Sequence, residues 1–227
     1  MEDGFIWKGI HSSEKGLRII SLPDITTPEQ RVEKVVVPGR SGDLTLTDND
    51  YEGEVKPVEF DYFNNNFDDI KTWLSGTGEV IFSNEPDRYY KARIINKIAL
   101  NQVLKKFHSG IVQFDCQPFG YSRNDSSIIK ITEAKEINNP GTGESTPVIT
   151  IYGYGNIDLN INDNIINLTN VSNHIIIDSE IMDCYRDGQL MNNYMKGKFP
   201  IFKVGINKIS WRGNVQRLEI KPNWRWL

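Results

Sequence analysis

The residues whose spacing most suggests chemistry follow the order of an EF-hand calcium loop. Acidic side chains and one glycine take its first, third, fifth, sixth and twelfth positions: Asp48, Asp50, Glu52, Gly53 and Glu59. Other features of the segment oppose calcium binding. Glu52 is one methylene longer than the Asp or Asn that a tight loop prefers, and Pro57 stands where the second helix should begin. Because both flanks also alternate as strands, we expect a hairpin tip and no metal site.

Residue types that could catalyse a reaction are present without the spacing that catalysis requires. His11, His108 and His174 stand apart, with no metal-ligating or nucleophilic partner at a known spacing. The glycine-rich segments 141–146 and 153–155 lack the lysine of a phosphate-binding loop. The 30 acidic residues offer no pair that the sequence marks as a general acid and base. We therefore expect no catalytic residue, no cofactor and no enzymatic activity.

Tryptophan and arginine alternate near the end of the chain, and these residue types are enriched at binding hot spots. The residues concerned are Trp211, Arg212, Arg217, Trp224, Arg225 and Trp226. They could form a platform for a sugar or a partner protein. Trp211 falls in phase with Ile209 on a strand face that should be buried, so we expect it in the core. Trp224 and Trp226 are left open between the two roles.

Composition excludes several classes of partner. The net charge of −4 and the pI of about 5.5 argue against nucleic-acid binding, which needs a dense basic surface. No apolar stretch reaches the length of a membrane span, and the acidic N-terminus has no signal-peptide pattern. The two cysteines, Cys116 and Cys184, suggest no disulfide framework and fit a reducing cytoplasm.

Short strands separated by glycine, proline, asparagine and aspartate clusters predict a mainly β protein, built as β-sandwiches with one short helix. The helix is expected from Asn66 to Ser75, where Phe67, Ile70 and Leu74 share one face and Gly76 follows the end.

The segment from Asn138 to Gly143 predicts a linker between two separable domains, residues 1–137 and 138–227. Beyond it, strands are expected at Pro147–Tyr152, Ile157–Ile161, Ile165–Leu168, His174–Ile177, Gly205–Trp211 and Val215–Lys221.

Three segments of the first half each join a turn to an extended run. Val37–Gly42 carries Pro38 and Gly39 in the central positions of a type II turn. In Ser83–Ala92, Tyr90 and Ala92 alternate with charged residues. In Phe114–Phe119, apolar and polar residues alternate until Pro118, which should end the ladder.

In this order and spacing, the three segments resemble the N-terminal domain of the distal tail proteins (Dit) of bacteriophages with long, flexible tails. Segments of the second half resemble the C-terminal galectin-like sandwich of the same family: Ile176–Glu180, Gly197–Pro200, Gly205–Asn207, Ile209–Trp211 and Ile220–Arg225. The resemblance covers nearly the whole chain, with both domains in the family order.

The resemblance implies a structural hub in the virion, at the distal tip of the tail. Residues 1–137 would form a hexameric ring with contacts near Pro38–Gly42 and Pro86–Ala92. Residues 138–227 would be the galectin-like attachment platform. The implied partners are the tail tube protein, the tail-associated lysin or fibre, and receptor-binding proteins. Assembly would take place in the cytoplasm of the host bacterium, from a phage or prophage gene. No insertion in the second domain supplies an added receptor-binding arm.

A second hypothesis is a carbohydrate-binding, lectin-like module that uses the C-terminal sandwich. Against it, the sequence shows neither an export signal nor an aromatic–Arg–Asn cluster on one strand.

Overall fold

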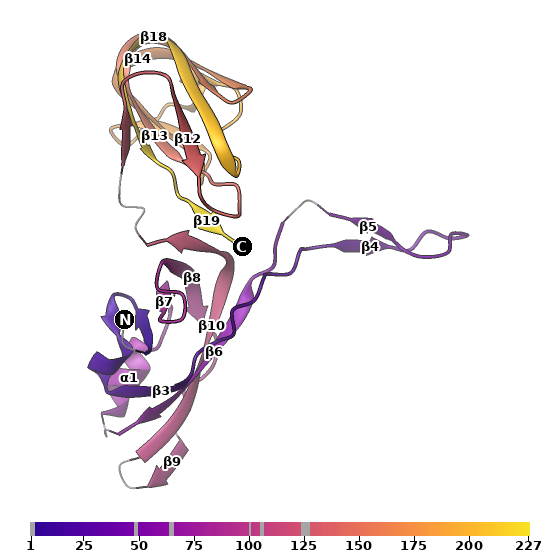
Figure 1. The fold of residues 1–227 in the computed structure, drawn as a ribbon, viewed down its shortest axis with the longest axis vertical. Coiled ribbons are helices and arrows are strands. Elements are labelled where there is room, and N and C mark those ends of the chain that lie inside the picture. The colour runs from indigo at the N-terminus through magenta and orange to yellow at the C-terminus, as the bar shows by residue number, and fades with distance from the viewer. Residues whose placement is uncertain (1–2, 48–49, 64–65, 100, 105–106, 124–127) are drawn as a thin grey trace. The chain divides into compact units, whose positions relative to one another are not determined.

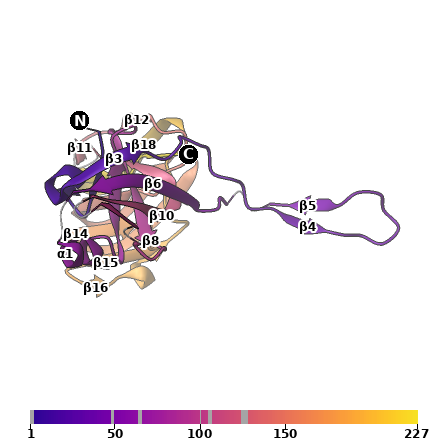
Figure 2. The same ribbon diagram turned by 90° about the horizontal axis from the view of Figure 1, so that it is seen from below.

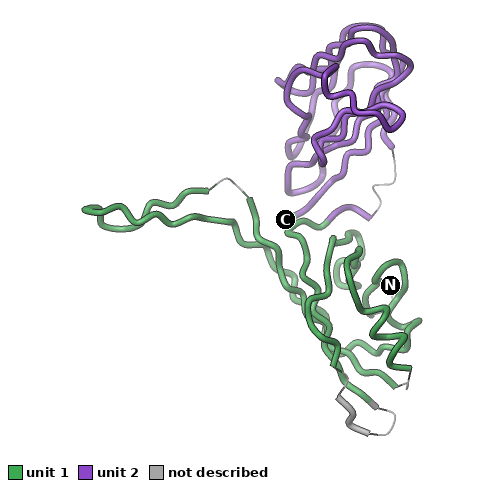
Figure 3. The backbone as a smooth tube through the Cα atoms, turned by 180° about the vertical axis from the view of Figure 1, so that it is seen from behind, with its two compact units in different colours: residues 1–120, 227 green, residues 121–226 purple. Residues whose placement is uncertain are grey.

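The computed structural model describes residues 3–47, 50–63, 66–99, 101–104, 107–123 and 128–227. The chain divides into two compact units, here called unit 1 (residues 1–120 with Leu227) and unit 2 (residues 121–226) (Figure 3). Both consist mainly of strands, which confirms the predicted fold class. The described helices include none with the length and apolar composition that a membrane crossing requires.

The division between the units comes earlier in the chain than the sequence predicts. A boundary between residues 137 and 138 would cut strand β12 (Lys135–Asn139), which pairs along its whole length with β18 (Gly205–Lys221). Asn139 is buried, its amide donates to the Gly143 carbonyl (3.1 Å), and its Oδ1 accepts from Gly141 N–H (2.9 Å). The Asn-Pro-Gly turn therefore lies within unit 2, because the asparagine amide satisfies the backbone of the turn.

Unit 1 is built on one sheet with the strand order β2-β1-β7-β8-β10-β6-β3, and β9 pairs with β10 (Figure 1). A separate two-stranded sheet joins β4 and β5. The bounds are β1 Phe5–Trp7, β2 Ile10–His11, β3 Leu17–Ser21, β4 Glu33–Val35, β5 Leu44–Leu46, β6 Glu54–Tyr62, β7 Thr77–Phe82, β8 Arg88–Ile94, β9 Asn101–Leu104 and β10 Phe107–Ser122. A 3-10 turn, η1 (Ser12–Lys15), follows β2.

The core of unit 1 is rich in aromatic rings. Tyr90 and Ala92 on β8, and Val112, Phe114 and Cys116 on β10, are buried as their alternation predicts. The Phe114 ring lies at the centre of an aromatic cluster, with ring centroids 5.3 Å from Phe5, 5.3 Å from Trp7 and 5.7 Å from Phe82. These edge and tilted contacts are the geometry that aromatic quadrupoles favour.

Helix α1 (Phe67–Trp73) lies within the predicted range, and Asn66 stands at its N-cap without a side-chain capping bond. Ile70 and Trp73 are buried, and Phe67 packs partly buried against the core of unit 1. The Trp7 indole N–H donates to the Trp73 carbonyl (2.9 Å), so a buried hydrogen bond fixes the last turn of the helix on β1.

Strand β10 continues past Pro118, where the sequence predicts the end of its ladder. Its ladder with β6 stops at Cys116, but the strand continues to Ser122, whose N–H donates to the Trp224 carbonyl (3.1 Å) before β19 (Arg225–Trp226). Pro118 removes only its own donor, and the strand can continue where that position needs no bond on the side of β6.

Unit 2 is an eight-stranded sheet with the order β11-β18-β13-β14-β15-β16, to which β12 and β17 add through β18 and β14. The remaining bounds are β11 Ile129–Ile131, β13 Val148–Ile161, β14 Asn164–Asp178, β15 Asp183–Arg186, β16 Gln189–Leu190 and β17 Met195–Lys196, with the 3-10 turn η2 at Asn192–Tyr194. The six strands expected beyond residue 146 are thus joined in pairs into three long ones, β13, β14 and β18.

Glycines let β13 and β18 bend where the sequence suggested that strands end, and in β14 Asn170 and Asn173 take the positive φ. Gly153 and Gly213 lie where two backbones nearly touch: an added Cβ would stand 2.3 Å from the Asn214 carbonyl oxygen and 2.5 Å from that of Asn156, respectively. The register shifts at the same place, between Gly155 and Ile157. Both halves of each bent strand face one apolar cluster, so the sheet folds over its own core as a sandwich.

Candidate assembly interface

A β-hairpin of unit 1, residues 31–47, extends away from the sheet of that unit and is here called the arm (Figure 2). Within the described residues, β4 and β5 pair only with each other. Apolar side chains on both faces are exposed: Val32, Val36, Val37, Leu44 and Leu46, with Val36 at 76%. An isolated two-stranded hairpin is marginally stable in water, and exposed apolar strands mark interaction sites. The arm therefore has the character of a surface that a partner covers.

The tip of the arm has the turn that the sequence predicts. Arg40 N–H donates to the Val37 carbonyl (3.1 Å), and Gly39 has a φ of +83°. A side chain at that φ would clash with the backbone, so glycine is needed in this position of a type II turn.

Backbone hydrogen bonds at the base of the arm join its two sides to each other just before β6 begins. Arg31 N–H donates to the Asp50 carbonyl (2.8 Å), and Glu52 N–H donates to the Glu29 carbonyl (2.8 Å). Tyr51, between them, contacts Phe119 in an edge-to-face arrangement, with the ring centroids 5.9 Å apart. The chain therefore enters β6 directly from the arm.

This arrangement bears on the EF-hand-like spacing. Asp48 and Asn49 lie outside the described residues, so the first position of that loop has no structural account. The flanks are strands, β5 and β6, as predicted. Glu59 lies in the middle of β6, about 17 Å along the strand from Glu54 at the usual rise per residue, and does not close a compact loop.

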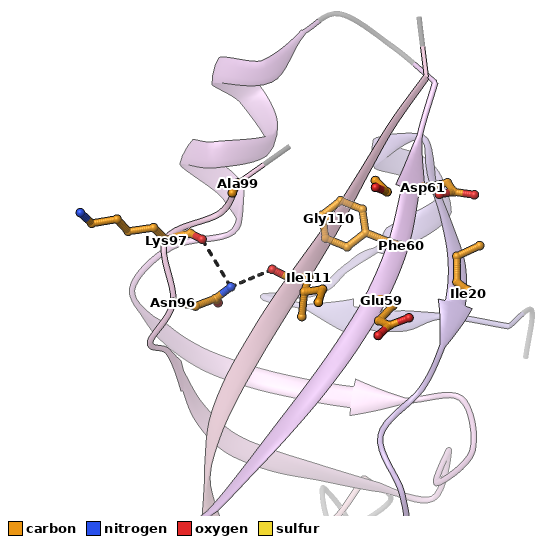
Figure 4. A pocket seen from close by; sticks show the side chains of 10 residues that line it. Ile20, Glu59, Phe60, Asp61, Asn96, Lys97, Ala99, Gly110 and Ile111 are labelled. Atoms are coloured by element: carbon orange, nitrogen blue, oxygen red, sulfur yellow. Dashed lines mark hydrogen bonds between the residues drawn. The ribbon is translucent and has the colours of Figure 1, made fainter. Parts of the chain in front are cut away.

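A hollow of about 390 Å³ lies on the outward face of β3, β6 and β10, and Figure 4 shows the side chains that line it. Ile20 and Ile111 supply exposed apolar surface, and Glu59 and Asp61 supply two carboxylates from β6. We call these four residues the acidic face. It joins apolar contact area to two carboxylates, and Lys97 lines the same hollow.

Asn96 forms one border of this hollow, and its side chain hydrogen-bonds to the backbone of β10 as a neighbouring strand would. Its Nδ2 donates to the Ile111 carbonyl (2.7 Å), and its Oδ1 accepts from Gln113 N–H (2.8 Å). The side chain therefore continues the hydrogen bonding of β10 just beyond the end of β8 (Figure 4).

Charged groups buried behind β6 are paired and serve structure. Lys56 is buried, with its Nζ 3.0 Å from a Glu54 carboxylate oxygen and over the Tyr90 ring. Tyr90 OH donates to Glu85 (2.8 Å), and Arg88 lies 3.6 Å from the same carboxylate group. Burial, followed by the bond to Glu85, raises the pKa of Tyr90. This network fixes the Ser83–Ala92 segment singled out in the sequence.

Other candidates from the sequence separate in the structure. Trp224 is buried and packs on Phe202 with ring centroids 5.6 Å apart, and Trp226 packs partly buried against the unit 2 core. Trp211, expected in the core, packs against the unit 2 core but is only partly buried, and it is also among the residues that line a hollow of about 360 Å³. Among the described residues, no group of three or more His, Cys, Asp or Glu side chains is placed to hold a metal ion.

These features define a mainly β protein of two units, one of which carries an apolar arm of the kind used in protein assembly. Among solved structures, the fold is similar to that of the SPP1 Dit protein (gp 19.1), described as a paradigm of the hub adsorption apparatus in phages that infect Gram-positive bacteria. The TM-score is 0.79 over 99% of each chain, at 13% sequence identity. No protein-family model and no curated protein sequence matches this chain. The chain therefore has a Dit-like fold.

Sequence reasoning identified the turn at Pro38–Gly42 but missed the arm and the acidic face. The signal for the arm was a run of valines, Val32 and Val35–Val37, beside a turn and far from any other apolar strand. The acidic face has no local signal, since Ile20 reaches Glu59 and Ile111 only through sheet pairing.

Proposed function

We propose that this chain is a structural component of a bacteriophage tail tip: a hub ring that links the tail tube to the tail-associated lysin or fibre and to receptor-binding proteins. Its place would be the distal end of the virion tail, after assembly in the host cytoplasm. The observation that carries the proposal is the Dit-like fold along 99% of the chain. The proposal assigns the chain no enzymatic activity and no cofactor.

The arm supports the ring part of this proposal. A closed ring needs head-to-tail contacts, in which one surface of a copy meets a different surface of the next. The arm offers exposed valines and leucines together with the cations of Lys34 and Arg40. The acidic face offers Ile20 and Ile111 with the carboxylates of Glu59 and Asp61. We assign the arm of one copy to the acidic face of its neighbour, because both offer exposed apolar area and because the arm carries three cations, Arg31, Lys34 and Arg40, against two carboxylates, Glu33 and Asp43.

The number of copies follows from the resemblance to the Dit family, which implies six. Six chains of 26.0 kDa form a ring of about 156 kDa. Unit 2 would then act as the platform for receptor-binding proteins, with the galectin-like role that the resemblance implies.

Light scattering of the concentrated full-length protein tests the ring, and negative-stain imaging shows whether a central hole is present. K34E/R40E on the arm and E59K/D61K on the acidic face should each raise the concentration needed for assembly about tenfold or more. The two sets combined should restore part of the assembly. The matched control, K198E/K221E, changes two exposed lysines of unit 2 and should assemble like the native chain.

Two results would contradict the proposal. One is a full-length protein that stays monomeric at high concentration even when the tail tube or lysin partner is added. The other is assembly that the control set impairs as strongly as the arm and acidic-face sets do.

A further inference from the structure

The outward face of β14, β15 and β16 in unit 2 carries a row of apolar side chains. Strand register places Ile176 opposite Tyr185, and Tyr185 opposite Leu190. Their neighbours along the strands, such as Ile177 and Cys184, are buried, and successive side chains alternate between the faces of a strand. The row therefore points away from the core. Leu190, at 68% exposed, ends it on β16, which pairs within the described residues with β15 alone and so forms an edge of the sheet.

The turn between β14 and β15 adds two exposed apolar side chains. Ile181 is 60% exposed and Met182 is 66% exposed. Met182 has a φ of +56°, a left-handed conformation that glycine adopts at a lower cost than any side chain of this size. Polar or small residues would form such a turn more easily. The retained isoleucine and methionine therefore indicate a use outside the fold, and a backbone outlier of this kind is typical of a binding surface.

Hydrogen bonds hold the turn in one conformation. The Asp178 carboxylate accepts from the N–H groups of Glu180 (3.0 Å) and Ile181 (3.4 Å). On the other side of the turn, the Asn192 side chain donates to Asp183 (2.9 Å) and so ties the start of β15 to the segment after β16. A surface that is already fixed loses little conformational entropy when a partner covers it. We call the row and the turn together the apolar edge: Ile176, Ile181, Met182, Tyr185 and Leu190.

The charges beside the apolar edge indicate what kind of partner fits it. The segment 178–190 contains four carboxylates and one guanidinium, an excess of three negative charges, whereas residues 138–227 as a whole contain eight acidic and nine basic residues. Half of the acidic residues of the second half of the chain are thus gathered in this segment. The guanidinium, Arg186, donates to the Ser172 carbonyl (3.4 Å), and Asp187 lies 3.5 Å from the His174 ring.

We propose that the apolar edge docks a cationic, apolar segment of another protein. The partner's apolar side chains cover the row and the turn, and its lysines or arginines face the carboxylates. An anionic membrane surface does not fit, because the carboxylates are repelled by it. Two apolar edges facing each other do not fit either, since like charges would meet. The inference goes beyond the proposed hub, because it assigns a surface and a partner chemistry that the ring does not need.

The experiment uses a yeast-displayed library of random 12-residue peptides, sorted for binding to the labelled full-length protein. Enriched peptides should combine lysine or arginine with large apolar residues. Fluorescence anisotropy with the best synthetic peptide then gives the affinity. Ile181→Asp and Leu190→Asp should each weaken it about tenfold or more, as loss of a central apolar contact does. The matched control is Ile165→Asp, at an exposed apolar position of unit 2 outside the apolar edge, and its affinity should equal that of the native chain.

The charge part of the proposal has its own measurement. E180K/D187K should weaken binding of the same peptide, and the affinity of the native chain should fall as salt is added. An affinity that depends on neither would contradict a cationic partner. Binding of the native chain to vesicles of phosphatidylglycerol that Ile181→Asp abolishes would show a membrane-binding turn instead, and would overturn the proposal.

The proposal is also overturned if no peptide is enriched, or if Ile181→Asp and Leu190→Asp leave the affinity of the best peptide unchanged. Circular dichroism checks that both variants fold, and light scattering should show that both assemble like the native chain. A protein that forms a ring but binds no peptide at the apolar edge contradicts this inference alone. A monomer that binds the peptide there contradicts the hub alone.

Discussion

The two units of this chain bury their apolar residues in different ways. Unit 1 fills its core with aromatic rings, centred on Phe114, and leaves an apolar arm exposed. Unit 2 fills its core mostly with isoleucine and leucine, and bends three long strands around it: β13 and β18 at glycines, and β14 at asparagines with positive φ. Each long strand of unit 2 therefore buries one face, whereas the arm strands of unit 1 bury neither.

This difference in burial indicates which unit depends on a partner for its conformation. A hairpin with two exposed faces is stabilised only when something else covers it, so its conformation depends on a partner. A sheet folded on itself needs no partner for its core, and its outward face is free to carry binding groups. This difference is the ground on which we propose that assembly acts through unit 1.

The strongest test of this difference removes a large side chain from the core of one unit and measures the stability of both units. Phe114→Ala should lower the free energy of unfolding of unit 1 by about 3–5 kcal/mol, because it removes the ring at the centre of the aromatic cluster. Ile157→Ala should lower that of unit 2 by about 2–5 kcal/mol. Ile111→Ala, at an exposed position of β10, is the control and should change little.

The measurement is urea unfolding followed by alkylation, since each unit contains one buried thiol: Cys116 in unit 1 and Cys184 in unit 2. Each core substitution should expose only the thiol of its own unit. Equal exposure of both thiols at one urea concentration would mean a single cooperative body and would remove the distinction.

The bend of the long strands of unit 2 near Gly213 offers a test with a smaller expected change in stability. Gly213→Ala should lower the free energy of unfolding by about 2–4 kcal/mol, because φ is +107° and the new Cβ would meet the Asn156 carbonyl oxygen. Gly155→Ala, also at positive φ but with open space around it, should lower it by only about 1–2 kcal/mol. Urea midpoints reported by Cys184 give both values. Equal losses would show that the close backbone approach does not determine the bend.

The two thiols also predict how stability depends on pH. Burial raises the pKa of Cys116 to about 12 and that of Cys184 to about 11. An unfolded chain loses these protons near pH 8.5–9, while the native chain keeps them, so native stability falls as pH rises above that range. Between pH 8 and 10, each thiol should lower the free energy of unfolding of its unit by about 1.5 kcal/mol. Cys116→Ala should remove this loss from unit 1 only, and a loss that persists unchanged would contradict the prediction.

The smallest effect on stability is expected in the arm. Val36→Asp should change the free energy of unfolding by no more than about 0.5 kcal/mol, because the side chain is exposed. It should nevertheless impair assembly in light scattering. Leu190→Asp, at an exposed position of unit 2, is the control for both readings. Equal loss of assembly in the two variants would show that the arm has no special role.

Local patterns in the sequence were sufficient to predict much of this structure. The helix at Phe67–Trp73, the turn at Gly39 and the alternation of β8 and β10 all follow from nearest neighbours along the chain. The domain boundary and the long strands of unit 2 do not. Glycine and asparagine can either end a strand or bend it. Which of the two happens depends on whether the neighbouring strand continues to pair beyond that residue, and the local sequence does not show this.

Surface clusters were harder to predict for the same reason. Asn160 lies far along the chain from Ser210 and Arg212, and the sheet register alone brings it to the same hollow. Trp211 was expected in the core because it is in phase with Ile209; it pairs with buried Leu159 and packs partly buried against that core.

The strand order also determines the sequence of events when the chain folds. In unit 2, β13 and β14 are joined by a short turn at Asn162–Asp163, so their long ladder can form as soon as both are made. In unit 1, Phe5 on β1 pairs with Phe82 on β7, and β6 pairs with β10, so the sheet closes only after distant segments meet. Such pairings fold slowly. The arm is therefore made, exposed and available to other chains before the sheet that carries it has closed.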